Sequence, residues 1–201
     1  MEVYILQLKK RKKIYTSLVI AFWLLLPIIF YTVTVHETMS FGKDVLGQER
    51  YEERMHDSIT YAAALFALLM PIMIPAIYLL QKTINMYLNV IPTLSATDIE
   101  KLKNSNEHAV FWEKYMPSYI IRDGAVIIFR LARQQTIYFK DIKSIHIKQG
   151  HYKGYSAIVR ITTEQKTQQF IFYGNPFKVS NLVQEALIVN PVIEVNKDWN
   201  R

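Results

Sequence analysis

Cysteine is absent from the 201-residue sequence, and glycine is scarce, with six residues that do not cluster. Without cysteine no segment can carry a disulfide, and cysteine usage says nothing about the redox compartment. Without clustered glycines the chain has no glycine-rich loop of the kind that cradles phosphates. The sequence therefore points to neither a disulfide framework nor a P-loop.

Charge is absent from two segments, residues 14–35 and residues 58–80, which contain no Asp, Glu, Lys, Arg or His. As a helix each would extend about 33 Å, at about 1.5 Å per residue, which is enough to cross a hydrocarbon layer of about 30 Å. A cleavable signal peptide is the alternative for the first segment, because KKRKK precedes it. That segment is too long for a signal peptide, however, and no cleavage site with small residues follows it. The sequence thus predicts two transmembrane helices.

The charges beside these segments predict their orientation. Five cations in a basic arm, residues 1–13, are predicted to lie at the membrane surface: Lys9, Lys10, Arg11, Lys12 and Lys13. The loop between the segments, residues 36–57, is acidic. Because Lys and Arg near membrane spans favour the cytoplasmic side, we expect the N-terminus and residues 81–201 in the cytoplasm and the loop outside. The predicted location is the cytoplasmic (inner) membrane of a bacterium.

The net charge of +7 falls in the regions predicted to face the anionic inner leaflet. A basic chain could instead bind nucleic acid, but no helix carries a stripe of Lys and Arg, and no ribonucleoprotein-type motif is present. We therefore expect the lipid bilayer as a partner, and no nucleic acid duplex.

Two prolines, Pro71 and Pro75, interrupt the apolar sequence LLMPIMIPAIYLL of the second segment. Each lacks the N–H that a helix needs, but in a membrane helix neighbouring groups can satisfy the freed carbonyls. Neither apolar segment holds a charged residue, which an ion or proton path would usually need. The prolines are therefore predicted to kink an anchor, and not to line a pore.

Residues 81–114 are predicted to form a helical connector. The sequence QKTINMYLNVIP should continue the second helix until Pro92 ends it. In LSATDIEKLKNSN, which follows, Thr97 and Glu100 have the spacing of a capping box, so a short helix is expected.

From residue 115 onward, apolar residues alternate with polar ones, which is typical of strands. SYIIRDGAVIIFR predicts a hairpin with a turn at Asp123 and Gly124, because glycine accepts the positive φ of a type I′ turn. About six short strands with short turns follow one another, so an antiparallel sheet is expected. A helix is then predicted to start at Pro176, with Asn175 as its cap, and its apolar stripe should cover the open end of the sheet. The stripe comprises Val179, Leu182, Val183, Ala186 and Leu187.

The predicted fold is a membrane-anchored α+β fold: two transmembrane helices followed by a small antiparallel β-sheet or barrel, residues 115–201, capped by a C-terminal helix. The segment FKDIKSIHIKQG resembles the strand-turn-strand pattern of bacterial pleckstrin-homology (PH)-like domains, and the two spans resemble their membrane-anchored, YcxB-like forms. The resemblance covers roughly residues 117–190. It implies seven strands, and the seventh could be VYILQL at residues 3–8 or VIEV at residues 192–195.

Catalytic and metal-binding patterns are not found, so neither an enzyme nor a cofactor is predicted. Ser156 lies in GYSAI, which departs from the nucleophile elbow at its fifth position and opens a strand. His146 and His151 have no cysteine or carboxylate beside them at ligand spacing, so no metal site is expected.

Cations on the predicted strands form the candidate binding surface. Because the alternate residues are apolar, these cations should project from the solvent face of the sheet. A solvated surface near the inner leaflet is one reading, and a site for an anionic lipid or an acidic partner is the other. The candidate residues are Lys140, Lys143, His146, Lys148, Lys153 and Arg160.

Two functions remain open. The resemblance implies that the chain could be a non-enzymatic immunity or resistance factor against bacteriocins, since several membrane-anchored PH-like proteins have that role. Its partner would then be a membrane-active peptide or protein toxin, and the cytoplasmic domain could form a homo-oligomer. The alternative is a two-span β-barrel effector that a cyclic nucleotide signal gates in antiphage defence.

Overall fold

A computed structural model of the chain describes residues 2–106, 116–150, 156–173 and 176–198. The chain divides into two compact units. The first, which we call the helical unit, is Lys9–Lys82. The second, which we call the mixed unit, combines Met1–Leu8 with Thr83–Arg201.

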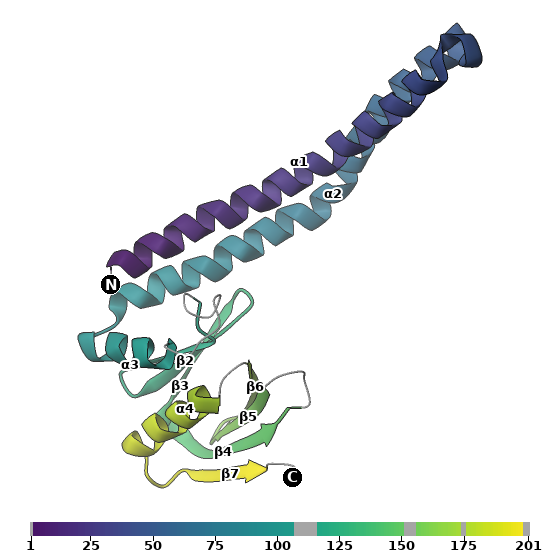
Figure 1. Cartoon of the computed structure of the whole chain (residues 1–201). Coiled ribbons are helices and arrows are strands. Elements are labelled where there is room, and N and C mark those ends of the chain that lie inside the picture. The colour runs from purple at the N-terminus through teal and green to yellow at the C-terminus, as the bar shows by residue number, and fades with distance from the viewer. Residues whose placement is uncertain (1, 107–115, 151–155, 174–175, 199–201) are drawn as a thin grey trace. The chain divides into compact units, whose positions relative to one another are not determined.

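Two long helices, α1 (Glu2–Leu46) and α2 (Gln48–Val90), form a hairpin (Figure 1). The first turns of α1, up to Leu8, and the last turns of α2, from Thr83, belong to the mixed unit, and the rest of the hairpin is the helical unit. The ring of Trp23 stacks on that of Phe66 at a centroid distance of 4.6 Å, and its Nε1 donates to the Phe66 carbonyl oxygen at 3.3 Å. Both helices are long and apolar enough to cross a membrane. The five cations of the basic arm lie on α1.

The stretch between the two apolar segments, residues 36–57, is almost entirely helical. α1 runs to Leu46 and α2 starts at Gln48. Two glycines leave the helical backbone, Gly42 with φ 71° and Gly47 with φ 78°. Such positive φ values are accessible to glycine at little cost, so these two residues allow the chain to reverse.

The two prolines of α2 are accommodated inside one helix. α2 is assigned as a single helix that contains Pro71 and Pro75. α1 likewise contains Pro27. Any bend at the prolines is therefore a deformation within a helix and not the end of one.

The mixed unit holds all the strands. The described elements are η1 (Ile91–Thr93), α3 (Ala96–Asn106), β1 (Tyr119–Arg122), β2 (Ala125–Arg130), β3 (Arg133–Tyr138), η2 (Phe139–Asp141), β4 (Ile142–Gln149), β5 (Ser156–Thr163), β6 (Thr167–Tyr173), α4 (Pro176–Val189) and β7 (Glu194–Asp198). They form a three-stranded sheet in the order β1-β2-β3 and a four-stranded sheet in the order β6-β5-β4-β7.

The first hairpin has the turn that its sequence predicts. Arg122 pairs with Ala125, so Asp123 and Gly124 alone form the loop. Their φ values are 50° and 68°, as a type I′ turn requires. The alternation predicted in β4 is also confirmed, since Ile145 and Ile147 are buried.

The seventh strand is the C-terminal one of the two that the sequence suggested. β7 lies at 194–198, slightly beyond residues 192–195, whereas residues 3–8 belong to α1. β7 runs parallel to β4, so the prediction of a purely antiparallel sheet is wrong at this position. Parallel neighbours need a long connection, and the chain makes one through β5, β6 and α4.

Two hydrophobic cores share the three-stranded sheet. One core contains Val126 and Ile128 together with β4, β5, β6 and the apolar stripe of α4. The other contains Ile127 and Phe129 together with the outermost turns of the long helices and α3. In this second core the ring of Tyr87 stacks on that of Phe129 at 4.1 Å. β2 is therefore buried on both faces.

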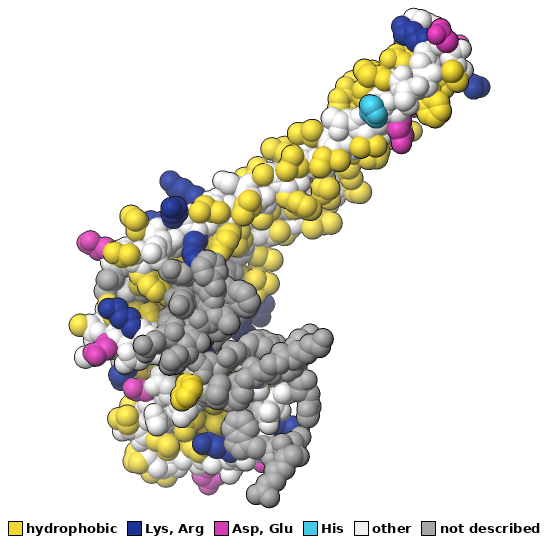
Figure 2. Space-filling model, in the orientation of Figure 1, with side chains coloured by type: hydrophobic (Ala, Val, Ile, Leu, Met, Phe, Trp, Pro, Cys, Tyr) yellow, Lys and Arg dark blue, Asp and Glu magenta, His cyan; other side chains and the backbone are white. Residues whose placement is uncertain are grey.

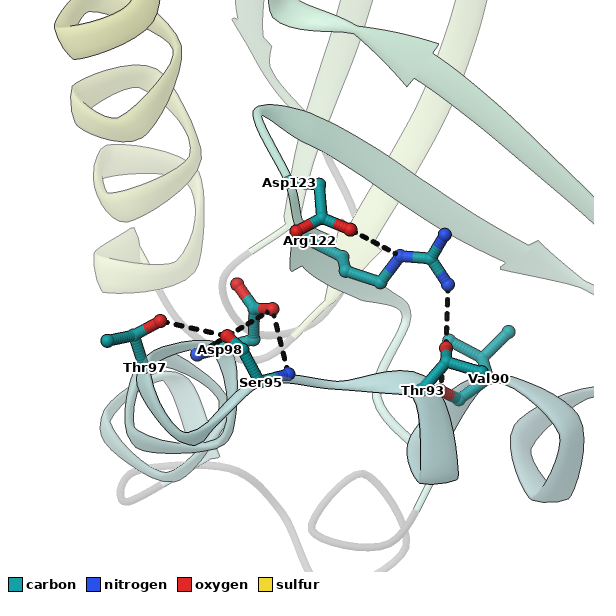
Figure 3. Close-up of polar contacts among 7 residues, drawn as sticks. All are labelled: Val90, Thr93, Ser95, Thr97, Asp98, Arg122 and Asp123. Atoms are coloured by element: carbon teal, nitrogen blue, oxygen red, sulfur yellow. Dashed lines mark hydrogen bonds and ion pairs between the residues drawn. The ribbon is translucent and has the colours of Figure 1, made fainter.

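The connector between α2 and the sheet is held by polar contacts (Figure 3). Ser95 caps α3: its Oγ accepts from the Asp98 N–H at 3.1 Å, and its own N–H donates to Asp98 Oδ2 at 3.1 Å. The capping box thus starts at Ser95, and the prediction that Thr97 and Glu100 form it is wrong. Near it, Arg122 Nη1 donates to Thr93 Oγ1 at 2.6 Å, which ties η1 to the first hairpin.

The type I′ turn makes a prediction for stability. Gly124→Val should lower the free energy of unfolding by about 1–2 kcal/mol, because a β-branched residue pays a steric penalty at positive φ. Asp123→Asn is the matched control, since asparagine tolerates this conformation, and it should change stability by under about 0.5 kcal/mol. Thermal unfolding of the full chain in detergent measures both. Equal stability of Gly124→Val and the parent protein would contradict the turn assignment.

Candidate functional site

A groove of about 1110 Å³ opens in the mixed unit where β4 and β7 begin and β5 ends. Its walls come from segments far apart in the sequence: the end of β3, η2, the turn between β5 and β6, and the loop after α4. The described lining residues that carry charge or a side-chain amide are Lys140, Asp141, Lys143, Glu164, Gln165, Lys166, Gln168, Asn190 and Glu194.

Asn190 shapes one wall of the groove. Its side-chain Nδ2 lies within hydrogen-bond distance of the carbonyl oxygens of Phe139, Lys140 and Ile142, at 3.2, 3.4 and 3.0 Å. It directly follows α4, which ends at Val189. The same residue therefore ends the helix and fastens it to the segment that links the two sheets.

The structure brings two of the predicted cations to the groove. Lys140 and Lys143 both line it and are exposed. Lys140 Nζ lies 5.7 Å from the centroid of the Tyr138 ring, and Lys143 Nζ forms an ion pair with Glu164 at 3.3 Å. Lys143 is thus partly neutralised by a carboxylate that the sequence analysis did not place beside it.

The other described candidates lie on the outer face of the four-stranded sheet. His146 and Arg160 are opposite each other on β4 and β5, and Lys148 follows on β4. Lys153 lies outside the described residues. His146 Nε2 lies 2.7 Å from Asp198 Oδ2 of β7, so this histidine has a carboxylate partner at the edge of the sheet.

Carboxylates accompany the cations at both places. In the groove Lys140, Lys143 and Lys166 stand against Asp141, Glu164 and Glu194. On the outer face, β7 puts Glu194 and Asp198 opposite Ser144 and Lys148. The surface is consequently of mixed charge, whereas the sequence predicted a basic one.

Gln168 is a groove residue that the sequence analysis missed. It is opposite the buried Ile161 of β5. Its side-chain Oε1 and Nε2 are both buried and have no hydrogen-bond partner in the described part of the chain. The sequence does hint at this position. In the strand TQQFIFY, Gln168 lies two residues before the buried Phe170 and so on the same, inward face of the strand.

Ser156, which was weighed as a catalytic serine, is not among the described residues that line the groove. Ser156 is buried at the start of β5, and His151 falls outside the described residues. In the described ranges no three His, Asp or Glu side chains are grouped so that they could hold a metal ion.

Comparisons of the chain with protein-family models, with curated proteins and with solved structures found no match.

Gln168 gives a second prediction. Gln168→Met removes two buried polar atoms that lack partners and keeps a similar volume, so it should raise the free energy of unfolding by about 1 kcal/mol or more. Gln169→Met, on the exposed face of the same strand, should change it by under about 0.5 kcal/mol. Denaturant titration of the full chain measures both. A clear loss of stability in Gln168→Met would show that the amide has a partner after all.

Proposed function

We propose that the chain is a non-enzymatic integral membrane protein whose two helices anchor a PH-like binding domain in a bacterial cytoplasmic membrane. The observation that carries the proposal is the apolar surface of the helical hairpin (Figure 2). On α1, Leu18 and Phe22 are 59% and 56% exposed, and on α2, Leu68 and Ile72 are 71% and 63% exposed. Each Å² of such surface costs about 25 cal/mol in water, so a lipid environment accounts for it.

The mixed unit supports the PH-like part of the proposal through its strand count and its layers. Seven described strands form two sheets, and α4 packs into the core that both sheets share. One feature departs from the family pattern, because β7 follows α4 and pairs in parallel with β4. The positive-inside rule places this unit in the cytoplasm.

Protection from a membrane-active peptide is the concrete function that we propose. The hairpin end that the rule places outside, residues 36–57, carries five exposed carboxylates: Glu37, Asp44, Glu49, Glu52 and Glu53. Two of its cations lie over aromatic rings, with Lys43 Nζ 5.3 Å from the Tyr51 centroid and Arg54 Cζ 5.7 Å from that of Phe41. Peptides that insert into anionic membranes carry Lys and Arg on their polar face. An acidic end can therefore attract a cationic peptide before it reaches the lipid.

Expression in a sensitive host tests this function. Cells that produce the full chain should survive a concentration of a cationic pore-forming peptide at least about tenfold higher than cells without it. A tenfold difference corresponds to about 1.4 kcal/mol of binding free energy. Changing Glu49, Glu52 and Glu53 together to Gln should abolish the protection, because the attracting charge is lost.

The matched control changes the same number of carboxylates elsewhere, at Glu2, Glu100 and Glu164, and should keep the protection. Equal loss in both triple variants would contradict capture at the hairpin end. Growth arrest on expression, dependent on an added cyclic nucleotide, would contradict immunity and support the gated effector instead.

A further inference from the structure

The two described sheets have four edges, and each edge strand presents unpaired backbone groups. Such edges are templates for pairing with another chain, so proteins usually cover them, shorten them or place charges on them. An edge that lacks these devices is a candidate for binding an extended segment. We therefore compared β1, β3, β6 and β7.

Three of the four edges have a protecting feature. α3 packs against β1, which is buried along most of its length. On β6, the guanidinium of Arg130 donates to the carbonyl oxygen of Gln169 and so occupies the free edge. β7 has five residues, of which Glu194, Lys197 and Asp198 are charged.

In the described part of the chain, none of these features protects β3 over most of its length. After Arg133 its sequence is QQTIY, with no charge, and its residues other than Ile137 are exposed or half-buried. In the described sheet β3 pairs with β2 alone. A strand of this kind is open to pairing on its second side.

The register shows which backbone groups point to the free side. Phe139 N–H donates to the Gly124 carbonyl oxygen at 2.9 Å, while Tyr138 stands opposite Ala125. In an antiparallel pair this bond pattern marks Tyr138 and Ala125 as a non-hydrogen-bonded pair. The N–H and C=O of Tyr138 therefore point away from β2, and alternation along the strand gives Thr136 the same orientation.

The groove lies beside these free groups, since Thr136 and Tyr138 both line it. Its volume of about 1110 Å³ leaves room for several residues of an extended chain. Among the described lining residues three lysines are balanced by three carboxylates, although the whole chain carries +7. A site for phosphate or an anionic headgroup would keep its cations unpaired, whereas a polypeptide of mixed charge matches a balanced rim.

We propose that the free edge of β3 and the adjoining groove bind an extended peptide segment of a partner protein, of mixed charge, as an added strand. Backbone hydrogen bonds to Thr136 and Tyr138 supply the affinity, and the lysines and carboxylates of the groove select the side chains. This site is separate from the acidic hairpin end and does not rest on the proposed immunity function.

A random nonapeptide display library, selected on the full chain in lipid nanodiscs, provides the probe. The most enriched sequence is synthesised, and its affinity is measured for the parent protein and for two variants. Thr136→Pro removes an N–H of the free β3 edge without removing a bond to β2, and edge strands tolerate proline. Ile171→Pro is the matched control, because the register of β5 and β6 points its N–H to the free side of β6, outside the groove.

Binding should fall at least about tenfold, or about 1.4 kcal/mol, in Thr136→Pro and stay unchanged in Ile171→Pro. A copy of the peptide with alternate backbone nitrogens methylated should lose binding to the parent protein, which keeps the test valid even where a proline variant fails to fold. Hydrogen exchange at the Thr136 and Tyr138 amides should slow when the unmodified peptide is added.

Three results would overturn the proposal. They are enriched peptides that bind Thr136→Pro as well as the parent protein, a methylated peptide that binds unchanged, or a selection that enriches no sequence. Protection of the Thr136 amide that depends only on protein concentration would assign the edge to a second copy of the chain.

Discussion

The burial of β2 on both faces is the constraint on which the rest of the mixed unit depends. Val126 and Ile128 face the core between the sheets, and Ile127 and Phe129 face the core that the helix ends complete. A two-stranded or one-sided sheet could be capped by α4 alone, but this one needs cover on its second face as well. Leu8 of α1 and Tyr87 and Val90 of α2 belong to that cover. The compact unit consequently extends well before residue 115, where the strand pattern starts.

The sequence predicted correctly those elements whose conformation depends on neighbouring residues alone, such as a tight turn or an alternating strand. Asp123 and Gly124 specify their turn because few residue pairs accept two positive φ values, and Ile145 and Ile147 mark the buried side of β4 by alternation alone. Local sequence does not decide which residue caps α3. Ser95 with Asp98 and Thr97 with Glu100 both have capping spacing, and the buried Leu94 just before Ser95 decides between them. That burial is a tertiary fact. The continuous apolar run AVIIF, by contrast, is typical of a strand that is buried on both faces.

The groove could not be predicted from any single stretch of sequence, because residues from several separate segments line it. It forms where β3, the turn after β5 and the loop after α4 converge, and the parallel pairing of β7 with β4 brings Glu194 to it. The sequence VIEVNKD carries charges at three of its seven positions, so its composition fits an unstructured tail as well as a strand. Once it pairs, its carboxylates change the character of the neighbouring surface. His146 then has an acidic partner on β7, and Lys143 has one in Glu164 after β5, so a count of lysines on β4 no longer measures affinity for anions.

Charge balance and backbone geometry favour the same kind of ligand at the groove. Ion pairs between exposed side chains contribute little to stability, so the balanced rim is better explained by recognition than by folding. The backbone groups of Thr136 and Tyr138 offer donors and acceptors in alternation, a pattern that another extended backbone reproduces and a single phosphate does not. On β6 the guanidinium of Arg130 donates to the carbonyl oxygen of Gln169, which points to the free side of that strand. The contrast between a covered edge and an open one on neighbouring sheets makes β3 the place where this fold can accept a further strand.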